Sequence, residues 1–213
     1  MADVRLLIAD DHAVVRQGIR QILSDAPEVK IVAEAATGVE ALELMRCSDV
    51  DLVLLDLSMP GLNGLDVVRQ LRHDRPEVRI LVLSVHPEEQ YAVRVMKAGA
   101  SGYLTKDSAP EELISALRHI ASGHKYVTAT LAERLATELE IGNDRLPHEA
   151  LSDREYQVML LIAEGLRVQD IAERLSLSAK TVSTYRTRLL RKMNMRTSTE
   201  LVRYALKHGL ITA

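Results

Sequence analysis

The stretch Leu52-Val53-Leu54-Leu55-Asp56 decides the fold, because four apolar residues lead directly into a carboxylate. A charged side chain at the end of a buried strand is costly unless something outside the sheet uses it. Three more apolar runs end in polar residues: 4–9 before Asp10 and Asp11, 80–83 before Ser84, and 102–105 before Lys106. Carboxyl ends of parallel strands meet at one edge of a sheet, where such sheets bind ligands. The sequence therefore predicts a shared site for these side chains.

Length and composition favour a protein of two modest domains. The chain has 213 residues, of which 47% are hydrophobic, and it lacks Phe and Trp, so we expect aliphatic cores. No apolar stretch approaches the roughly 20 residues of a membrane span, and the start shows no signal peptide. The single cysteine, Cys47, excludes an internal disulfide and fits a reducing cytoplasm. We therefore expect a cytoplasmic protein that does not associate with a membrane.

The net charge of -3 hides an asymmetry between the two halves of the chain. Residues 1–125 hold 14 Lys/Arg and 19 Asp/Glu, so their net charge is -5. Residues 151–213 hold 11 Lys/Arg and 6 Asp/Glu, so their net charge is +5. An acidic half followed by a basic half indicates a module that handles cations or phosphate, joined to a nucleic-acid binder.

The first 122 residues alternate strand-like and helix-like segments. We expect strands near 4–9, 30–35, 51–56, 79–84 and 102–105, and helices near 14–24, 38–47, 64–73, 87–98 and 110–121. Strands made almost entirely of Val, Ile and Leu indicate burial on both faces. The pattern predicts an α/β fold, a doubly wound five-stranded parallel sheet covered by helices.

The rest of the chain divides into a linker and a second, smaller all-α domain. Residues 123–149 form the expected linker, with one amphipathic helix at 131–139 and a breaker-rich tether at 142–147. From 150 to 213 the pattern predicts four helices, ending near 164, 175, 193 and 208. The box Ser152-Asp153-Arg154-Glu155 opens the first of them, and Ser178 is the expected cap of the third.

The chemistry expected at the sheet edge is phosphoryl transfer to a carboxylate. An attacking carboxylate needs a cation to offset repulsion between anions, and Mg²⁺ prefers oxygen ligands. Asp10 and Asp11 supply such oxygens beside Asp56. In-line transfer would leave an acyl phosphate on Asp56, whose oxygens Lys106 and the Ser84 hydroxyl can contact.

Residues 3–122 resemble the receiver domain of response regulators. The matching motifs are Asp10-Asp11-His12, Leu54-Leu55-Asp56-Leu57-Ser58-Met59-Pro60-Gly61, Ser84, and the segment Lys97–Lys106. The resemblance implies a flavodoxin-like sheet of order 2-1-3-4-5 and phosphorylation of Asp56 by a sensor histidine kinase. It also implies that the Ser58 backbone carbonyl joins the Mg²⁺ ligands, and that Ser84 and Tyr103 form the switch pair. Two departures from the family stand out: Asp107 follows Lys106 where many receivers have Pro, and Val85, then His86, follow Ser84 where many have a small residue. We hypothesise that these positions alter the lifetime of the phosphoryl group.

The basic half carries a helix–turn–helix pattern. Between Glu173 and Glu200 there is no acidic residue, as expected of a surface that meets DNA phosphates. The segment resembles the LuxR-type helix–turn–helix through Leu151–Glu155, Ile162–Leu166, Ile171–Leu175, Ser178–Val182 and Leu189–Met193. By that likeness Ser183, Thr184 and Thr187 face base edges, while Lys180, Arg186, Arg188, Arg191 and Lys192 are candidates for the DNA backbone. The family usually has Gly where Ser176 stands.

Taken together, the chain resembles the NarL/FixJ subfamily of two-component response regulators. The resemblance implies Mg²⁺-dependent phosphorylation of Asp56 that controls homodimerisation and sequence-specific binding to double-stranded DNA, with RNA polymerase as a further partner. Helix 198–208 would pair two copies. We expect no enzyme, beyond slow self-dephosphorylation. Two alternatives remain: a regulator that works through protein contacts without phosphate, and an aspartate-nucleophile phosphohydrolase, which the serine at Ser58 disfavours. A dinucleotide-binding enzyme is weaker still, because no glycine-rich turn follows the first strand.

Overall fold

The computed structural model describes residues 3–140 and 146–211. The chain divides into two compact units, Met1–Leu135 and Ala136–Ala213. Most of the tether that the sequence predicts at 142–147 lies outside the described residues.

A five-stranded parallel sheet forms the centre of the first unit. Its strands are β1 (Val4–Ala9), β2 (Val29–Ala35), β3 (Leu52–Asp56), β4 (Arg79–Ser84) and β5 (Gly102–Thr105). Their order is β2-β1-β3-β4-β5, and each neighbouring pair is parallel. Every residue of β3 is buried, which explains why this strand is aliphatic until Asp56. The predicted fold and strand order are confirmed.

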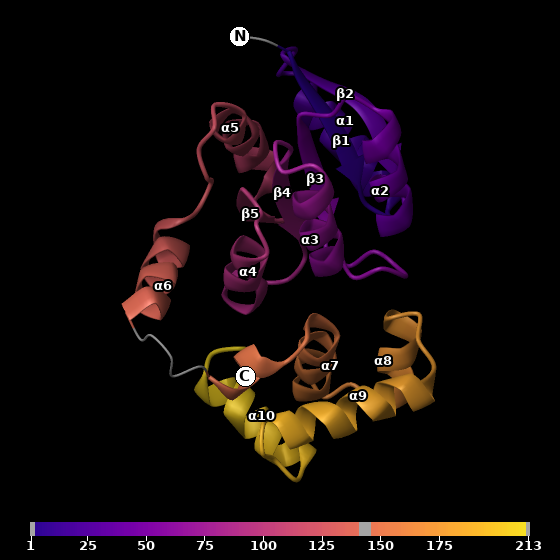
Figure 1. Ribbon diagram of the computed structural model, residues 1–213, viewed down its shortest axis with the longest axis vertical. Helices are drawn as coiled ribbons and strands as arrows, with labels where there is room; N and C mark the ends of the chain where they lie inside the picture. Colours follow the sequence, from indigo (N-terminus) through magenta and orange to yellow (C-terminus); the bar gives the residue numbers. More distant parts are fainter. Residues whose placement is uncertain (1–2, 141–145, 212–213) are drawn as a thin grey trace. The chain divides into compact units, whose positions relative to one another are not determined.

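Helices cover both faces of this sheet (Figure 1). They are α1 (Ala13–Leu23), α2 (Gly38–Cys47), α3 (Gly64–Asp74), α4 (Glu88–Lys97) and α5 (Ala109–Ala121). α1 and α5 share a core with the strands through Ile19, Leu113 and Leu117, which are at most 3% exposed. α3 lies between α2 and α4 and contacts both. The arrangement brings the carboxyl ends of all five strands to one open edge.

The chain continues to pack on the first unit beyond residue 122. Tyr126 forms a bridge with Gly102 next to β5, and its hydroxyl donates to Glu112 Oε2 at 2.6 Å. Burial and the Glu112 carboxylate raise the pKa of Tyr126 to about 12. The Thr128 hydroxyl donates to Glu88, and α6 (Ala129–Glu140) follows. The first part of the predicted linker therefore belongs to the compact unit.

The second unit is helical. A 3-10 turn, η1 (Pro147–Ala150), precedes α7 (Asp153–Ala163), α8 (Val168–Arg174), α9 (Ala179–Lys192) and α10 (Ser198–Lys207). Ser152 and Glu155 form the expected capping box of α7, and the Ser178 hydroxyl caps α9. α9 packs against α7 and α8, while α10 packs against α7. In the turn between α8 and α9, Ser176 adopts a left-handed φ of 53°. No helix among the described residues is both long and apolar enough to cross a membrane.

Candidate functional site

Four strands deliver the polar side chains of the first site. Asp10 and Asp11 follow β1, Asp56 ends β3, Ser84 ends β4 and Lys106 follows β5. The register pairs Ala9 of β1 with Leu55 of the adjacent β3. The next residues, Asp10 and Asp56, therefore follow side by side at the ends of these strands. Asp10 and Asp56 are only 2% and 1% exposed. The structure thus brings the predicted acids, hydroxyl and amine to one edge of the sheet.

A lysine lies between two buried carboxylates. Lys106 Nζ is 2.6 Å from Asp10 Oδ2 and 2.9 Å from Asp56 Oδ2. Burial of Asp56 raises the pKa of its carboxyl, and the nearby Lys106 opposes this shift without cancelling it. Burial alone would lower the pKa of Lys106, but the attraction of Asp56 and Asp10 outweighs it and raises that pKa. The lysine is therefore held as a cation against both acids.

Backbone amides fix the two buried acids. The amide of His12 donates to Asp10 Oδ1 at 2.8 Å, and the amide of Ser58 donates to Asp56 Oδ1 at 3.1 Å. Both bonds reach back two residues, as in the turns that Asp favours after a strand. Arg16 Nη1 also donates to the Asp10 carbonyl at 2.6 Å. Each carboxylate is held in place while one of its oxygens meets Lys106.

Three carboxylates share the site with a single lysine. Ligand atoms of Asp10, Asp11, His12 and Asp56 lie within 4.8 Å of one another. Asp11 Oδ1 is buried and receives no hydrogen bond from the described residues, although the His12 ring nitrogen lies 2.8 Å away. A buried acceptor beside two further carboxylates fits a hard divalent cation, which takes oxygen ligands. His12 is a neighbour that the sequence reasoning did not weigh as a site residue.

The candidate switch residues are buried behind the acids. Ser84 is fully buried, and its hydroxyl oxygen accepts from the His86 amide at 3.1 Å. The Tyr103 ring is turned inward, 1% exposed, and its hydroxyl donates to the His86 carbonyl at 2.8 Å. His86 also places Nε2 3.4 Å from Ser58 Oγ and its ring 4.7 Å from that of Tyr91. His86 therefore touches both members of the pair and the loop after Asp56.

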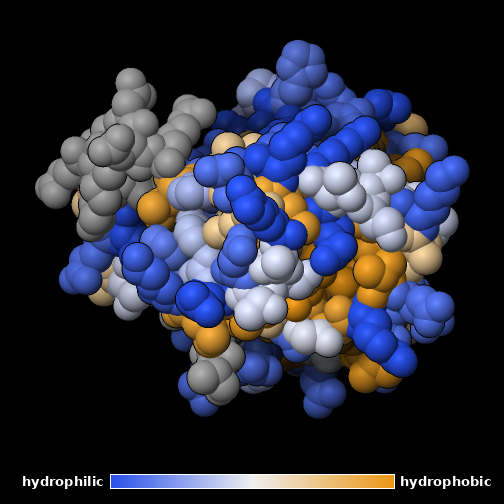
Figure 2. Space-filling model, turned by 90° about the horizontal axis from the view of Figure 1, so that it is seen from below, coloured by the Kyte–Doolittle hydropathy of each residue, from blue (hydrophilic) through white to orange (hydrophobic). Residues whose placement is uncertain are grey.

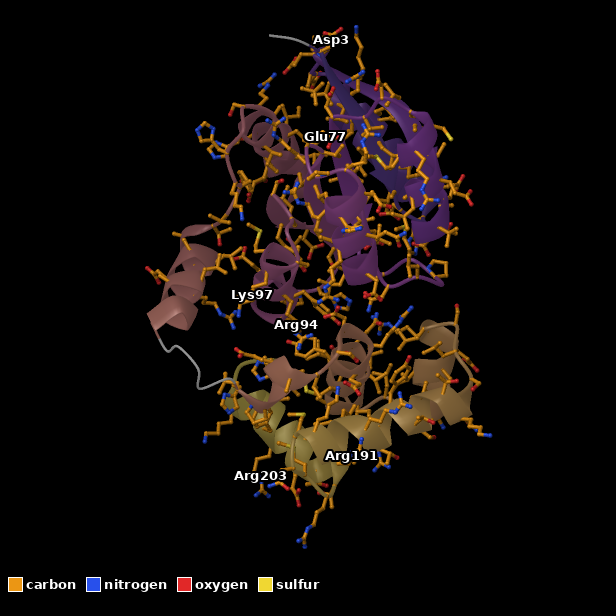
Figure 3. The ribbon with its side chains drawn as sticks, viewed as in Figure 1. Asp3, Glu77, Arg94, Lys97, Arg191 and Arg203 are labelled. Carbon is orange, nitrogen blue, oxygen red and sulfur yellow. The ribbon has the colours of Figure 1, made fainter. Side chains whose placement is uncertain are left out.

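The candidate nucleic-acid interface is the exposed side of α9. Its exposed residues include Lys180, Ser183, Thr184, Thr187, Arg188 and Arg191. Thr184 and Thr187 donate to the carbonyls of Lys180 and Ser183 in the helix itself, at 2.9 and 3.0 Å. Arg191 on α9 lies on the same side of the unit as Arg203 on α10 (Figure 3). Hydrophilic residues predominate on the face drawn in Figure 2.

Two of the residues predicted to contact DNA phosphates bond instead to other residues of the second unit. Arg186 donates from Nε and Nη2 to Ser198 Oγ at 3.2 and 3.0 Å, which ties α9 to α10. Lys192 Nζ lies 2.6 Å from Glu155 Oε2, which ties α9 to α7. In contrast, the side chains of Lys180, Arg188 and Arg191 make no hydrogen bond or ion pair within residues 3–140 and 146–211. The cations of α9 thus fall into two groups that the sequence did not separate.

A parallel sheet with acids at its carboxyl edge, followed by a basic helix–turn–helix unit, defines a class of signalling proteins that pairs a receiver with a DNA-binding domain. The comparisons with known families agree. Residues 6–118 match the response regulator receiver domain, and residues 149–205 match the LuxR family of bacterial regulatory proteins. The chain therefore belongs to the response regulators, and within them to the NarL/FixJ family.

Similar proteins match over nearly the full chain. Response regulator UvrY of Escherichia coli strain K12 is 42% identical over 211 residues, which cover 99% of this chain and 97% of the relative. Response regulator GacA of Pseudomonas aeruginosa is 37% identical, with 99% of each chain covered. A structure of RcsB from Salmonella typhimurium matches with a TM-score of 0.69 at 27% identity, over 100% of both chains. An RcsB–DNA complex matches with a TM-score of 0.60 at 27% identity, over 99% of this chain and 100% of that one.

Proposed function

We propose that Asp56 accepts a phosphoryl group from a sensor histidine kinase and that this modification controls dimerisation and DNA binding of the second unit. The observation that carries the proposal is the position of Lys106, whose Nζ contacts Asp56 at 2.9 Å and Asp10 at 2.6 Å. A cation fixed there can offset the negative charge of a phosphoryl group that is transferred to the neighbouring carboxylate. Membership of the response regulators supports the same conclusion.

The transfer is a displacement at phosphorus. An Asp56 carboxylate oxygen forms the new O–P bond while the P–N bond of the donor phosphohistidine breaks. The electron pair of that bond returns to the imidazole nitrogen, which takes up a proton from solvent. Lys106 and the Ser84 hydroxyl then contact the phosphoryl oxygens, and the Ser58 amide keeps the acceptor carboxylate oriented.

The acids around Asp56 suit a magnesium ion. Asp10, Asp11, Asp56 and the Ser58 backbone carbonyl would hold it, and the buried Asp11 Oδ1 is the acceptor that most needs such a partner. When bound, the ion supplies positive charge between the phosphoryl group and the carboxylates. Lys106 alone cannot balance three carboxylates and a phosphate. Chelation of divalent cations should therefore prevent labelling of Asp56.

Phosphorylation is proposed to act on the pair Ser84 and Tyr103. Ser84 would turn its hydroxyl from the His86 amide toward the phosphoryl group, while Tyr103 keeps the inward position that it already holds against the His86 carbonyl. Loss of the bond to Ser84 would free the segment that leads into α4. A shift of such an equilibrium from 1:99 to 99:1 takes roughly 5.5 kcal/mol of differential stabilisation.

The proposed effect of phosphorylation, DNA binding, depends on the basic second unit. In the proposal α9 enters the major groove, with Ser183, Thr184 and Thr187 toward base edges and Lys180, Arg188 and Arg191 toward phosphates. α10 would pair two copies, and RNA polymerase would be a further partner at the promoter. A cytoplasmic location is part of the proposal, because the proposed DNA target lies there.

Two other functions are less well supported. A phosphohydrolase of the aspartate type needs a second acid two residues after the nucleophile, and Ser58 occupies that position; slow self-dephosphorylation is the most that we propose. A regulator independent of phosphate would have no use for the lysine and the three converging acids.

Labelling with a radioactive phosphodonor in the presence of Mg²⁺ tests the proposal. We expect the full chain to take up phosphate and Asp56→Ala to take up none, with circular dichroism unchanged. Asp66→Ala removes an exposed carboxylate near the start of α3 and is the matched control, because it should label like the parent protein. Phosphate uptake by Asp56→Ala would refute the assignment.

A further inference from the structure

Arg16 joins three elements of the receiver beside the acidic site. It lies in the first turn of α1, directly after the loop that carries Asp10 and Asp11. Its Nη1 donates to the Asp10 backbone carbonyl at 2.6 Å, and its Nε donates to Glu34 Oε2 on β2 at 3.0 Å. The Arg16 side chain is only 19% exposed, so both bonds are partly shielded from water. One guanidinium therefore ties the end of β1 to both α1 and β2.

Glu34 holds Arg16 in this position. It lies on β2, the strand that pairs with β1, and its second carboxylate oxygen accepts from Arg20. Burial alone would raise the pKa of Glu34, but Arg16 and Arg20 outweigh it and lower that pKa. The carboxylate is therefore ionised at neutral pH, and its charge-assisted bond fixes the direction of the Arg16 guanidinium.

The bond from Arg16 reaches the peptide group that leads into Asp11. The carbonyl that it contacts belongs to Asp10, whose own amide donates to the Ala35 carbonyl at 3.1 Å. The backbone is thus held on both sides of Asp10, which fixes the direction in which Asp11 follows. Asp11 Oδ1 is buried and receives no hydrogen bond from the residues that the structure describes. The position of this oxygen therefore depends on the backbone that Arg16 holds.

We propose that Arg16 is a positioning residue for the divalent cation, which orients Asp11 for metal binding without contacting the ion. The inference rests on the proposed function, because Mg²⁺ is part of it. A partner that fixes the ligands beforehand reduces the entropy that is lost when the ion binds. By charge alone a guanidinium opposes a nearby cation, so its removal would tighten Mg²⁺ binding. The positioning role predicts weaker binding instead, and the sign of the change separates the two effects.

Titration of the full unphosphorylated chain with MgCl₂ at constant ionic strength, followed by its amide NMR signals, tests the inference. We expect Arg16→Met to weaken Mg²⁺ affinity about tenfold, the low end of what loss of an outer partner costs a metal site. Arg16→Lys keeps the charge but lacks the planar fork that bonds Asp10 and Glu34 together, so its affinity should be intermediate. Arg20→Met is the matched control, because it removes a guanidinium from the same Glu34 carboxylate. It should bind Mg²⁺ within about twofold of the parent, since only an exposed charge is lost.

Labelling of Asp56 at several Mg²⁺ concentrations separates positioning from a merely structural role. Arg16→Met should need about tenfold more Mg²⁺ for half-maximal labelling, while its rate at saturating Mg²⁺ stays near that of the parent. A merely structural role would lower the urea midpoint and leave Mg²⁺ affinity unchanged. Equal or tighter Mg²⁺ binding by Arg16→Met, or an equal loss in Arg20→Met, would overturn the inference. If the parent chain takes up no label at any Mg²⁺ concentration, the proposed function fails, whereas the Mg²⁺ affinities of the variants still decide the role of Arg16.

Discussion

Lys192 Nζ lies 2.6 Å from Glu155 Oε2, and this ion pair joins the end of α9 to the beginning of α7. The same Glu155 carboxylate accepts from the Ser152 amide at 2.8 Å in the capping box. Its side chain is only 5% exposed, whereas that of Lys192 is 38% exposed. A lysine that the sequence assigns to DNA therefore holds two helices of the unit together.

Lys192→Met should lower the free energy of unfolding of the second unit by about 1 kcal/mol at pH 7. Removal of one partner leaves Glu155 buried without its cation, and exposure of Lys192 keeps the cost below that of a fully buried pair. Burial alone would raise the pKa of Glu155, but Lys192 and Ser152 outweigh it and hold it below 4.5 in the folded protein. The stabilisation is therefore complete above pH 4.5 and is lost as the pH falls through the lowered pKa.

Urea denaturation followed by the NMR signals of the second unit, at pH 7 and near pH 3.5, measures this difference. The gap between Lys192→Met and the parent should narrow at the lower pH. Arg191→Met is the neighbouring control, and it should leave stability within about 0.5 kcal/mol because its side chain is exposed. A gap that widens in acid would contradict the expected sign.

Arg188→Ala and Lys180→Ala should weaken DNA binding without loss of stability. Both side chains are exposed on α9. Each phosphate contact that is lost should flatten the plot of log affinity against log salt by roughly 0.9. Fluorescence anisotropy with labelled promoter DNA at several salt concentrations gives the slope. An unchanged slope would count against these residues as backbone contacts.

Arg186→Ala provides the contrast, because this guanidinium is bonded to Ser198 at the start of α10. We expect it to destabilise the pairing of α9 and α10 by about 1 kcal/mol. Its effect on the salt slope should be smaller than that of Arg188→Ala. If Arg186→Ala changes the salt slope as much as Arg188→Ala does and leaves stability unchanged, Arg186 contacts DNA phosphates after all.

Ser176→Gly should stabilise the second unit by about 0.5 kcal/mol. Ser176 is exposed and has a φ of 53°, a region in which a side chain costs roughly 1–2 kcal/mol, while glycine offsets part of that gain through its unfolded-state entropy. Asn194, with a φ of 55°, is the matched position. Because asparagine tolerates this conformation better, Asn194→Gly should gain less. Urea midpoints of the two variants decide, and a loss of stability in Ser176→Gly would show that its hydroxyl contributes.

The sheet could be predicted from the sequence because burial on both faces leaves a plain signal. β3 is aliphatic up to Asp56 and β4 is aliphatic from Ile80 up to Ser84, and these two polar residues lie at the same edge of the sheet in the structure. Strand order came from the family resemblance and not from periodicity. The capping box at Ser152 was equally visible, since both of its partners are local in sequence.

Contacts between distant residues could not be predicted in this way. Nothing in the basic run of α9 separates Lys192 from Arg191, because the difference depends on where Glu155 lies after folding. The packing of Tyr126 beside Gly102 has the same origin, and it extends the first unit past the composition break near residue 122. The contact of His86 Nε2 with Ser58 Oγ likewise follows from proximity in space alone.

The segment after Ser84 should govern how long the phosphoryl group survives. Val85 is 58% exposed although it adjoins the buried Ser84, and His86 Nε2 lies 3.4 Å from Ser58 Oγ on the loop after Asp56. We hypothesise that these side chains flank the approach of water to the acyl phosphate. Val85→Ala opens that approach, so we expect decay to quicken by a factor on the order of 3, which corresponds to less than 1 kcal/mol of barrier.

Decay of the labelled protein in the absence of the kinase measures this rate. Val39→Ala, at another exposed valine on α2, is the control and should leave the rate unchanged. His86→Ala removes the ring beside Ser58 and should act in the same direction as Val85→Ala, because both variants expose the same side of the carboxylate. If Val85→Ala and His86→Ala decay at the parent rate, water reaches Asp56 by another path, and the residues after Ser84 serve only to position the hydroxyl.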